Sequence, residues 1–198
     1  MCGRYYVKDD LESEIRRVLK QSGGDCDLPM PGMQSRDVHP SEAAAVIASR
    51  TDKQLTCEEM TWGFPNPKNT GLLINARSET VFDKPMFSDG ILHRRCVIPA
   101  SGFYEWDHAK NKVTFTREDS TPVWLGGLFS SFGDTCRFVI LTTGANASML
   151  PVHDRMPVIL DEGQINEWIN DGSRTRELLA APMPLLGRSQ EYEQLSLF

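Results

Sequence analysis

The sequence predicts one α+β domain, in which helices flank a curved or barrel-like, mainly antiparallel β-sheet. Short segments of strand-like composition follow one another through the middle of the chain, and helical patterns lie at both ends of this series. The 198 residues are enough for one well-formed core and do not require a second domain. We expect the domain to span residues 1–180 and a tail to span residues 181–198.

Helical periodicity is clearest in residues 9–21, where an aspartate leads and Gly23 and Gly24 end the pattern. A second helix is expected to begin at Asp161, and a third to cover residues 174–180. The apolar residues expected to face inward are Leu11, Ile15, Val18 and Leu19 in the first helix and Ile165, Trp168 and Ile169 in the second.

Strands are predicted from short runs of β-branched, aromatic and apolar residues that are separated by turn-forming residues. A polar hairpin is expected at residues 108–112, and a long ordered loop at residues 24–40, which contain several prolines and glycines. The predicted strands are residues 43–49, 55–62, 96–99, 103–106, 113–116, 123–128 and 138–142.

Composition limits the classes of function. The formal net charge of −6 at pH 7 argues against a protein that coats nucleic acid through its overall charge. Any DNA contact must come from a local group of arginines, and the candidates are Arg4, Arg77, Arg94, Arg95 and Arg155. Because the sequence shows neither a signal peptide nor an apolar run long enough to span a bilayer, we expect a cytoplasmic, nucleoid-associated protein.

The cysteines and histidines do not predict a metal site. The five cysteines are odd in number and lack the short spacings of zinc or redox pairs, and the four histidines show no paired ligand spacing. No phosphate-binding or dinucleotide fingerprint is visible either, so we expect no cofactor. Four of the cysteines are expected to be buried or half-buried small apolar residues, while Cys2 differs through its position.

Cys2 would become the amino-terminal residue if Met1 were removed, which is common before a small residue. An amino-terminal cysteine carries an amine of pKa about 7.7–8.0, so part of it is nucleophilic near neutral pH. The amine can form an imine with an aldehyde, and the thiol can then close onto the imine carbon to give a thiazolidine. The alternative is that Cys2 is an incidental small residue near a terminus.

Four motifs give Cys2 a context. They are MCGRY at residues 1–5, INARSE at 74–79, PASGFYEW at 99–106 and HDRMP at 153–157. Their order and separations resemble those of the SRAP family, whose members shield abasic sites in DNA. The resemblance runs from residue 2 to about residue 170, with smaller echoes at VHP 38–40, WGF 62–64, MF 86–87 and LTT 141–143.

The resemblance implies catalytic roles for Cys2, Asn75, Glu105 and His153. Asn75 would hold the Cys2 amine and the sugar, since its amide both donates and accepts hydrogen bonds. Glu105 would shuttle a proton, and His153 would act as general acid on the sugar oxygen. Taken singly, Asn75 also suits a turn or helix cap, Glu105 a surface position at a strand edge, and His153 a structural hydrogen-bonding position.

The resemblance also implies a DNA-binding group. Arg4, Arg77 and Arg155 each lie two residues beyond a proposed catalytic residue and would bind phosphates beside the lesion. Trp106 would stack on an unpaired base. Surface salt bridges for the arginines and a core position for the tryptophan are the alternatives.

Two segments add further expectations. Family members often carry tryptophans after the WGF-like motif, but residues 65–70 here contain no aromatic residue, which leaves a preference for strand junctions open. The chain ends in Gln194, Leu195, Ser196, Leu197 and Phe198, which resembles the short motif that binds the bacterial sliding clamp. A tail packed on its own domain is the alternative.

The leading hypothesis is a monomeric DNA-repair protein that crosslinks through Cys2 to abasic sites in single-stranded DNA, after an autoproteolytic removal of Met1. One alternative is a cysteine peptidase that acts chiefly on its own amino terminus. Another is a non-catalytic adaptor associated with the sliding clamp.

Overall fold

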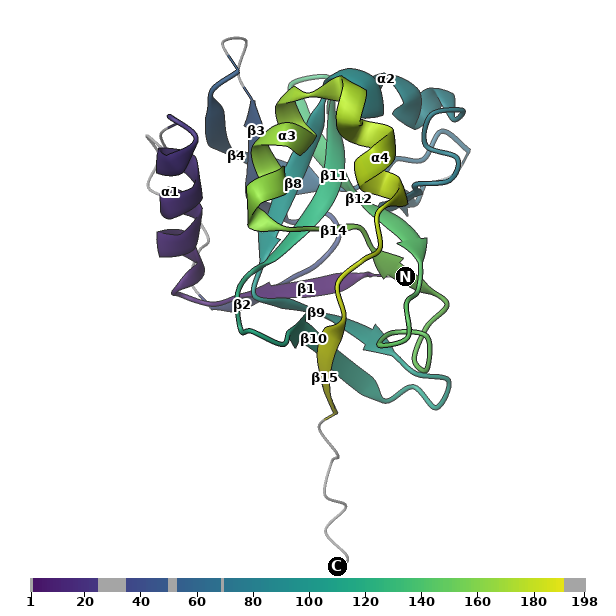
Figure 1. The fold of residues 1–198 in the computed structure, drawn as a ribbon. Helices are drawn as coiled ribbons and strands as arrows, with labels where there is room; N and C mark the ends of the chain where they lie inside the picture. Colours follow the sequence, from purple (N-terminus) through teal and green to yellow (C-terminus); the bar gives the residue numbers. More distant parts are fainter. Residues whose placement is uncertain (1, 25–34, 50–52, 69, 191–198) are drawn as a thin grey trace, which may run out of the picture.

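A closed five-stranded barrel forms the centre of the fold (Figure 1). Its order is β12–β4–β3–β8–β11, and β11 pairs again with β12 to close the ring. The β12–β4 pair is parallel and the other pairs are antiparallel. The strands are β3 (Ala43–Ser49), β4 (Leu55–Trp62), β8 (Arg95–Ala100), β11 (Val123–Phe132) and β12 (Thr135–Gly144). The computed structural model describes residues 2–24, 35–49, 53–68 and 70–190.

The barrel interior is filled by large apolar side chains. Trp62 and Phe138 are fully buried, and their rings stack with centroids 6.1 Å apart. Gly127 allows β11 to approach its neighbours, because a Cβ there would lie 2.4 Å from Ile98 Cδ1 and 2.8 Å from the Val139 carbonyl oxygen. Close packing of this kind fixes the strand register. The predicted curved or barrel-like sheet is therefore confirmed.

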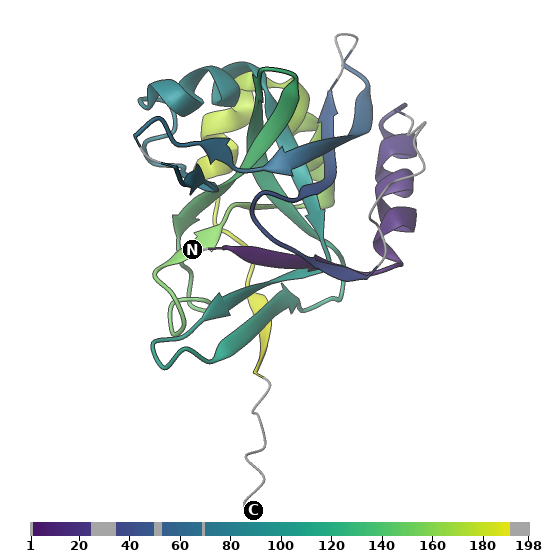
Figure 2. The same ribbon diagram turned by 180° about the vertical axis from the view of Figure 1, so that it is seen from behind.

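A second sheet of five strands packs beneath the barrel, in the order β15–β10–β9–β1–β2 (Figures 1 and 2). Side chains on β1, β9 and β10 alternate between buried and partly exposed, so one face is apolar. The β9–β10 hairpin turns at residues 107–111, close to the predicted position. Its strands are β1 (Arg4–Val7), β2 (Arg36–Val38), β9 (Gly102–Trp106), β10 (Lys112–Arg117) and β15 (Leu186–Gln190).

Short strands extend both layers. β7 (Asn75–Arg77) runs parallel to β12, and β13 (Arg155–Pro157) runs antiparallel to it. β14 (Ile159–Leu160) pairs with β11, while β5 (Phe64–Pro65) pairs with β6 (Leu72–Leu73). The long strand β12 therefore brings two motif-bearing segments to one region of the molecule.

The helices lie outside the sheets (Figure 1). α1 (Leu11–Gln21) begins two residues after the expected start and buries its predicted apolar face. α3 (Ile165–Asn170) and α4 (Thr175–Ala180) follow the 3₁₀ turns η1 (Glu162–Gln164) and η2 (Gly172–Arg174), as predicted for this region. α3 buries Ile165, Trp168 and Ile169, which is the expected set.

Helix α2 (Pro85–His93) was not predicted from the sequence. It contains Gly90, a poor helix former, and its apolar and polar residues are weakly segregated. A Cβ at position 90 would lie 2.8 Å from Leu128 Cδ1, so the glycine lets the helix pack closely on β11. Tertiary packing, rather than local propensity, accounts for this helix.

A buried arginine links α2 with α3. Arg95 is 5% exposed, and its guanidinium donates hydrogen bonds to carbonyl groups at the ends of both helices. The acceptors are the carbonyl oxygens of Ile91, Leu92, Trp168 and Ile169. Carbonyls at helix ends lack partners inside the helix, so this arrangement caps both helices. Arg95 therefore has a structural position and is not a candidate for DNA contact.

The region expected to be a tail enters the fold in part. β15 pairs with β10 from Val113↔Gln190 to Arg117↔Leu186, and Leu186 is buried. The structure thus places residues 186–190 in the second sheet, because β10 offers an open edge and Leu186 an apolar anchor. The motif at residues 194–198 lies outside the described residues. Across the part of the chain that the structure describes, no helix has the length and apolar character needed to span a bilayer.

Candidate functional site

Cys2 lies in the interior, immediately before β1, and is 1% exposed. The Asn75 side-chain amide on β7 donates a hydrogen bond of 2.9 Å to the Cys2 carbonyl oxygen. The other amide atom, Asn75 Oδ1, is buried and accepts no hydrogen bond from any described residue. A buried acceptor without a donor is costly, so this oxygen is suited to receive a donor beside Cys2.

Glu105 approaches Cys2 from β9. It is 4% exposed and points to the buried face of the second sheet, opposite to Tyr104 and Trp106. Burial raises the pKa of the Cys2 thiol, and the negative charge of Glu105 raises it further. The thiol is therefore protonated at neutral pH, with a carboxylate nearby that can accept or return a proton.

His153 precedes β13 and keeps 27% of its side chain exposed. The Arg155 backbone N–H donates to His153 Nδ1 at 2.9 Å, so in the neutral ring the proton sits on Nε2. The same Nδ1 lies 2.9 Å from Asp154 Oδ1, a contact that is favourable for the protonated ring. In both ribbon views the start of the described chain lies beside the segment that leads into β13 (Figures 1 and 2).

Arg155 is held tightly by protein groups. Its guanidinium binds the Glu79 carboxylate through two contacts of 2.5 and 2.8 Å, and it donates to the Thr142 carbonyl oxygen at 2.7 Å. Arg155 in turn lowers the pKa of Glu79 through these hydrogen bonds. A phosphate would have to compete with Glu79 for this guanidinium. Glu79 had no role in our sequence analysis, although it lies within the INARSE motif.

Arg4 and Trp106 form a pair on the surface. The Arg4 guanidinium lies 5.2 Å from the Trp106 ring centroid, and Arg4 Nη1 lies 3.7 Å from Asp37 Oδ2. Arg77 is exposed on β7, on the same face of that strand as Asn75. The structure therefore brings Cys2, Asn75 and Glu105 together and places Arg4 with Trp106 at the edge of this site.

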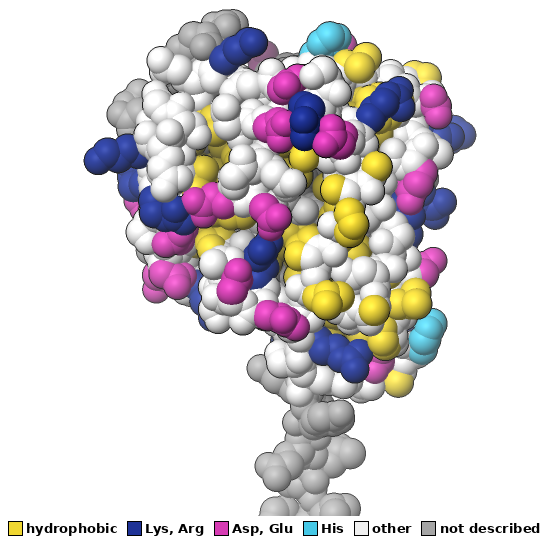
Figure 3. All heavy atoms as spheres, viewed as in Figure 1, with side chains coloured by type: hydrophobic (Ala, Val, Ile, Leu, Met, Phe, Trp, Pro, Cys, Tyr) yellow, Lys and Arg dark blue, Asp and Glu magenta, His cyan; other side chains and the backbone are white. Residues whose placement is uncertain are grey.

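Charged side chains of both signs are mixed on the surface of the molecule. Figure 3 shows Lys and Arg side chains interspersed with Asp and Glu over the face it presents, without a large area of one sign. Among the residues that the structure describes, no group of three or more His, Cys, Asp or Glu side chains could hold a metal ion. Cys57 and Cys96 are buried and Cys136 is half-buried, whereas Cys26 lies outside the described residues.

The arrangement has the parts for chemistry on a carbonyl compound. It combines a potential amine and thiol at Cys2, an amide that fixes the backbone there, and a nearby carboxylate. A half-exposed imidazole completes the set of proton donors and acceptors.

Comparison with known proteins identifies the family of this chain. The family model described as SOS response associated peptidase (SRAP) matches residues 1–196. The abasic site processing protein YoaM of Bacillus subtilis is 32% identical over 197 residues, covering 90% of this chain and 83% of YoaM. The abasic site processing protein YedK of Escherichia coli is 26% identical over 192 residues, covering 91% and 86%.

Relatives extend to vertebrates and to solved structures. The abasic site processing protein HMCES of Xenopus tropicalis is 26% identical over 226 residues, covering 87% of this chain and 67% of HMCES. A crystal structure of a protein from Bordetella bronchiseptica superposes with a TM-score of 0.77 at 23% identity, covering 96% of this chain and 100% of the other. One from Bacteroides thetaiotaomicron gives 0.75 at 20% identity, covering 97% and 93%. These two likenesses concern the fold.

Proposed function

This chain belongs to the SRAP family, and we propose that it processes abasic sites in single-stranded DNA by bonding to them through Cys2. The relatives named as abasic site processing proteins support the substrate. The observations that support the chemistry are the hydrogen bond from the Asn75 amide to the Cys2 carbonyl oxygen and a Glu105 carboxylate near enough to raise the pKa of the Cys2 thiol.

The proposed reaction begins after the Met1–Cys2 amide is hydrolysed. The free Cys2 amine adds to the C1′ aldehyde of the ring-opened abasic sugar, and loss of water gives an imine. The thiol sulfur then bonds to the imine carbon, while its proton passes to the nitrogen. One water is released, no oxidation or reduction occurs, and the product is a five-membered thiazolidine.

Neighbouring groups have separate tasks in this proposal. Asn75 holds the Cys2 carbonyl through Nδ2, and its unpaired Oδ1 accepts a hydrogen bond from the Cys2 amine. Glu105 takes the proton that the buried thiol must lose, which matters because burial disfavours the thiolate. His153, in its protonated form, gives its Nε2 proton to the sugar oxygen as the ring opens and is left as the neutral imidazole that accepts from the Arg155 backbone N–H.

Arginines bind the phosphates on either side of the lesion in this proposal. Arg4 and Arg77 are placed for direct contact, because they are partly or fully exposed beside Cys2 and Asn75. Arg155 reaches a phosphate only by exchanging its Glu79 partner for it. Trp106 offers a stacking face next to Arg4.

A denaturing gel tests the crosslink. Protein with a free Cys2 is mixed with single-stranded DNA that carries one abasic site, beside Cys2→Ala and a variant with one extra residue before Cys2. Only the first should give a heat-stable shifted band. Cys2→Ala keeps an amine but lacks the thiol, so it should give a band only after borohydride reduction of the imine. Absence of any heat-stable band, with Met1 removal confirmed by mass, would rule out the thiazolidine.

Peptidase activity forms a second, narrower part of the proposal. The family description includes the word peptidase, and we propose that the activity is limited to removal of Met1. A general cysteine peptidase uses an accessible thiolate, whereas burial and Glu105 keep the Cys2 thiol protonated here. Mass spectrometry of freshly synthesised Glu105→Gln should show retained Met1, and turnover of an added peptide by the mature protein would contradict the limit.

The carboxyl-terminal motif supplies a proposed protein partner. Leu197 and Phe198 would fill an apolar pocket on the bacterial sliding clamp, with Gln194 fixing the register. The folded domain, which includes β15, would then act as a monomer attached to the clamp. Surface-immobilised clamp should bind the wild-type protein and not Leu197→Ala/Phe198→Ala. Equal binding by both proteins would remove this partner and leave the crosslinking proposal unaffected.

A further inference from the structure

The second sheet has a solvent-facing side that carries aromatic rings and cations. Side chains that alternate with the buried residues of β1, β9 and β10 point to this side, as the burial patterns of the strands show. We call it the aromatic face. Its rings and cations are Arg4, Tyr6, Lys8, Tyr104, Trp106 and Lys112. The Asp37 carboxylate of β2 lies among them, where it pairs with Arg4 and accepts a hydrogen bond from the Tyr104 hydroxyl.

Rings and cations on the aromatic face are interleaved. The Tyr6 and Tyr104 rings lie with centroids 5.2 Å apart and an interplanar angle of 30°. Lys112 Nζ lies 4.9 Å from the Tyr104 centroid, and Lys8 Nζ lies 5.9 Å from that of Tyr6. Together with Arg4 above Trp106, each ring of this face has a cation at its side.

A glycine holds the Tyr6 ring against the sheet. Gly102 pairs with Tyr6 across β1 and β9, and a Cβ at position 102 would lie 2.6 Å from the Tyr6 hydroxyl oxygen. The same Cβ would lie 2.7 Å from Tyr6 Cε1, so the ring covers the space that a side chain would fill. The Tyr6 ring therefore lies over the β9 backbone at position 102, beside the Tyr104 ring.

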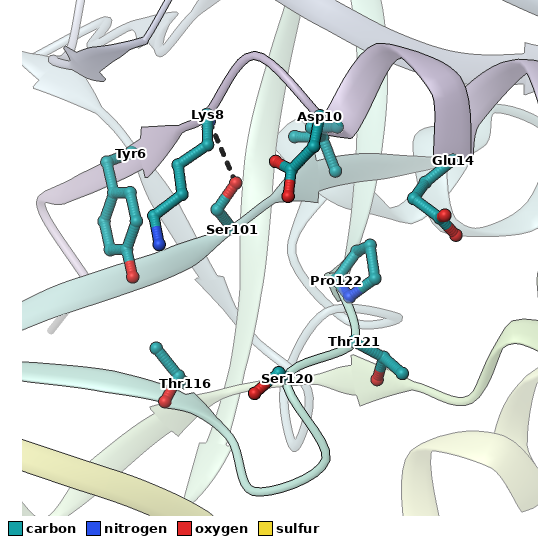
Figure 4. Close-up of a pocket in the computed structure, with 10 residues that line it drawn as sticks. Tyr6, Lys8, Asp10, Glu14, Ser101, Thr116, Ser120, Thr121 and Pro122 are labelled. Atoms are coloured by element: carbon teal, nitrogen blue, oxygen red, sulfur yellow. Dashed lines mark hydrogen bonds between the residues drawn. The ribbon is translucent and has the colours of Figure 1, made fainter.

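The aromatic face ends in a cavity of about 290 Å³ between β1, the start of α1 and the loop before β11. Figure 4 shows the Tyr6 and Lys8 side chains on one side and the Thr116 and Ser120 hydroxyl groups on the other. Asp10 and Glu14 line the end next to α1. The volume is near the lower limit for small-molecule sites, about 300–1,000 Å³, and suits a planar fragment such as a nucleobase.

We propose that the aromatic face binds the undamaged single strand next to the abasic site, with nucleobases stacked on Tyr104 and Tyr6 and one base in the cavity beside Lys8. This inference rests on the proposed function for the position of the abasic sugar at Cys2. It gives a DNA-binding role to Tyr6, Lys8, Tyr104 and Lys112. None of these four residues has a role in the proposed function.

Charge and continuity select a single strand as the occupant. Single-stranded nucleic acid is held where cations follow the backbone and aromatic rings accept bases, and this face supplies both in alternation. The face also begins at the Arg4–Trp106 pair, two residues from Cys2, so a strand leaving the abasic site meets it directly. From Arg4 to Lys8 the strand covers about 13 Å, enough for several stacked nucleotides.

Crosslinking to a long and a short strand tests the assignment. The long strand carries about six nucleotides on each side of the abasic site, and the short strand carries one. For each protein we would measure the half-saturating DNA concentration with both strands and take the ratio of short to long. The wild-type ratio should be about 5 or more, because each stacked base adds that much affinity. Strands extended on one side only would then give the polarity.

Substitutions on the face should lower this ratio. Tyr104→Leu and Lys112→Gln should each bring it toward 1, while Lys20→Gln on α1, away from the face, should retain the wild-type ratio. Thermal melting checks that each variant is folded. A wild-type ratio near 1, or variants that keep the wild-type ratio, would overturn the inference. Variants that lose affinity equally for the long and the short strand would also overturn it.

A second measurement separates this inference from the proposed function. If the wild-type protein forms no crosslink, fluorescence anisotropy with undamaged strands of the same two lengths still measures binding at the face. Weaker binding of the long strand by Tyr104→Leu and Lys112→Gln would then support the aromatic face although the crosslinking proposal had failed. Equal binding by wild type and variants would overturn the inference independently.

Discussion

Single residues at the site act through contacts that join distant parts of the chain. Asn75 fixes the Cys2 carbonyl, and Glu105 raises the pKa of the Cys2 thiol, so one residue holds the backbone of the proposed nucleophile and another disfavours ionisation of its thiol. Glu79 has a comparable relation to Arg155, whose backbone N–H in turn contacts His153. Loss of Asn75 should therefore affect Cys2, and loss of Glu79 should affect Arg155 and, through it, His153.

Asn75→Ala should slow formation of the heat-stable adduct by about 10-fold or more. The substitution removes the donor to the Cys2 carbonyl and the acceptor proposed for the amine, and such hydrogen bonds are commonly worth about 1–3 kcal/mol when buried. Single-turnover crosslinking at saturating DNA measures the rate. Asn111→Ala, which removes an exposed hairpin asparagine, is the matched control and should react at the wild-type rate. An unchanged rate in Asn75→Ala would contradict the role given to this amide.

Glu79→Gln should lower stability at neutral pH but not in acid. Arg155 holds the pKa of Glu79 below its usual value of 4.5, so the ionised carboxylate favours the folded state above that pH. As the pH falls through the lowered pKa the carboxylate takes up a proton, and the advantage over glutamine disappears. Because Glu79 is half exposed, we expect a difference of about 1 kcal/mol at most at pH 7.

Urea unfolding at pH 7 and near pH 3 measures this difference, with Glu59→Gln at an exposed position of β4 as control. The gap between wild type and Glu79→Gln should close at the lower pH. A gap of equal size at both values would show that the ion pair with Arg155 is not its origin.

At the scale of elements, β12 organises the site. It pairs with β7 on one side and with β13 on the other, so the INARSE and HDRMP motifs meet although they lie far apart in sequence. β9 brings Glu105 from the second sheet, and its alternation separates Glu105 from Tyr104 and Trp106. One strand therefore supplies a catalytic candidate on its buried face and part of the proposed binding surface on the other.

Two adjacent leucines, Leu185 and Leu186, test whether the edge strand β15 packs on the core as the structure indicates. Leu186 is 4% exposed and packs in the core, whereas Leu185 is 59% exposed. Leu186→Ala should lower the free energy of unfolding by about 2–5 kcal/mol, and Leu185→Ala should change it by less than about 0.5 kcal/mol. Denaturant unfolding measures both. Similar values for the two variants would show that β15 is not held as the structure indicates.

At the scale of the whole molecule, an acidic protein must bind an anionic polymer. The formal net charge of −6 gives repulsion at long range, and the cations proposed to contact DNA are confined to the site and the aromatic face. The proposed covalent product would reduce the affinity that is needed, because the bond itself would retain the DNA. The reversible encounter should nevertheless depend on salt.

The half-saturating DNA concentration should rise with salt concentration. The slope of log affinity against log salt should be proportional to the number of phosphates that the protein contacts. With Arg4, Arg77, Lys8 and Lys112 as contacts, the slope of log affinity against log salt should be about −3 on single strands. Titration of crosslinking between about 50 and 200 mM salt gives the slope. Lys112→Gln should reduce its magnitude by about 0.7, since one phosphate contact is lost. A slope near zero would exclude this electrostatic contribution.

The sequence alone determined the helices and strands whose formation depends on residues close together in the chain. The periodicity of residues 9–21 and of the segment that begins at Asp161 predicted two helices and their buried faces, which the structure has at residues 11–21 and 165–170. Strand composition predicted the barrel strands. The sequence did not predict α2, because Gly90 obscures the local pattern, or β1, β2 and β15, which are short and mixed in polarity.

Only the tertiary structure decided which side chains meet. Asn75 contacts Cys2 across 73 residues of sequence, and Arg155 contacts Glu79 across 76. The motifs named the residue types, but local periodicity carries no information about the register of β7 and β13 on β12 or the closure of the barrel. Those depend on long-range packing, which places each contact only once the whole core has formed.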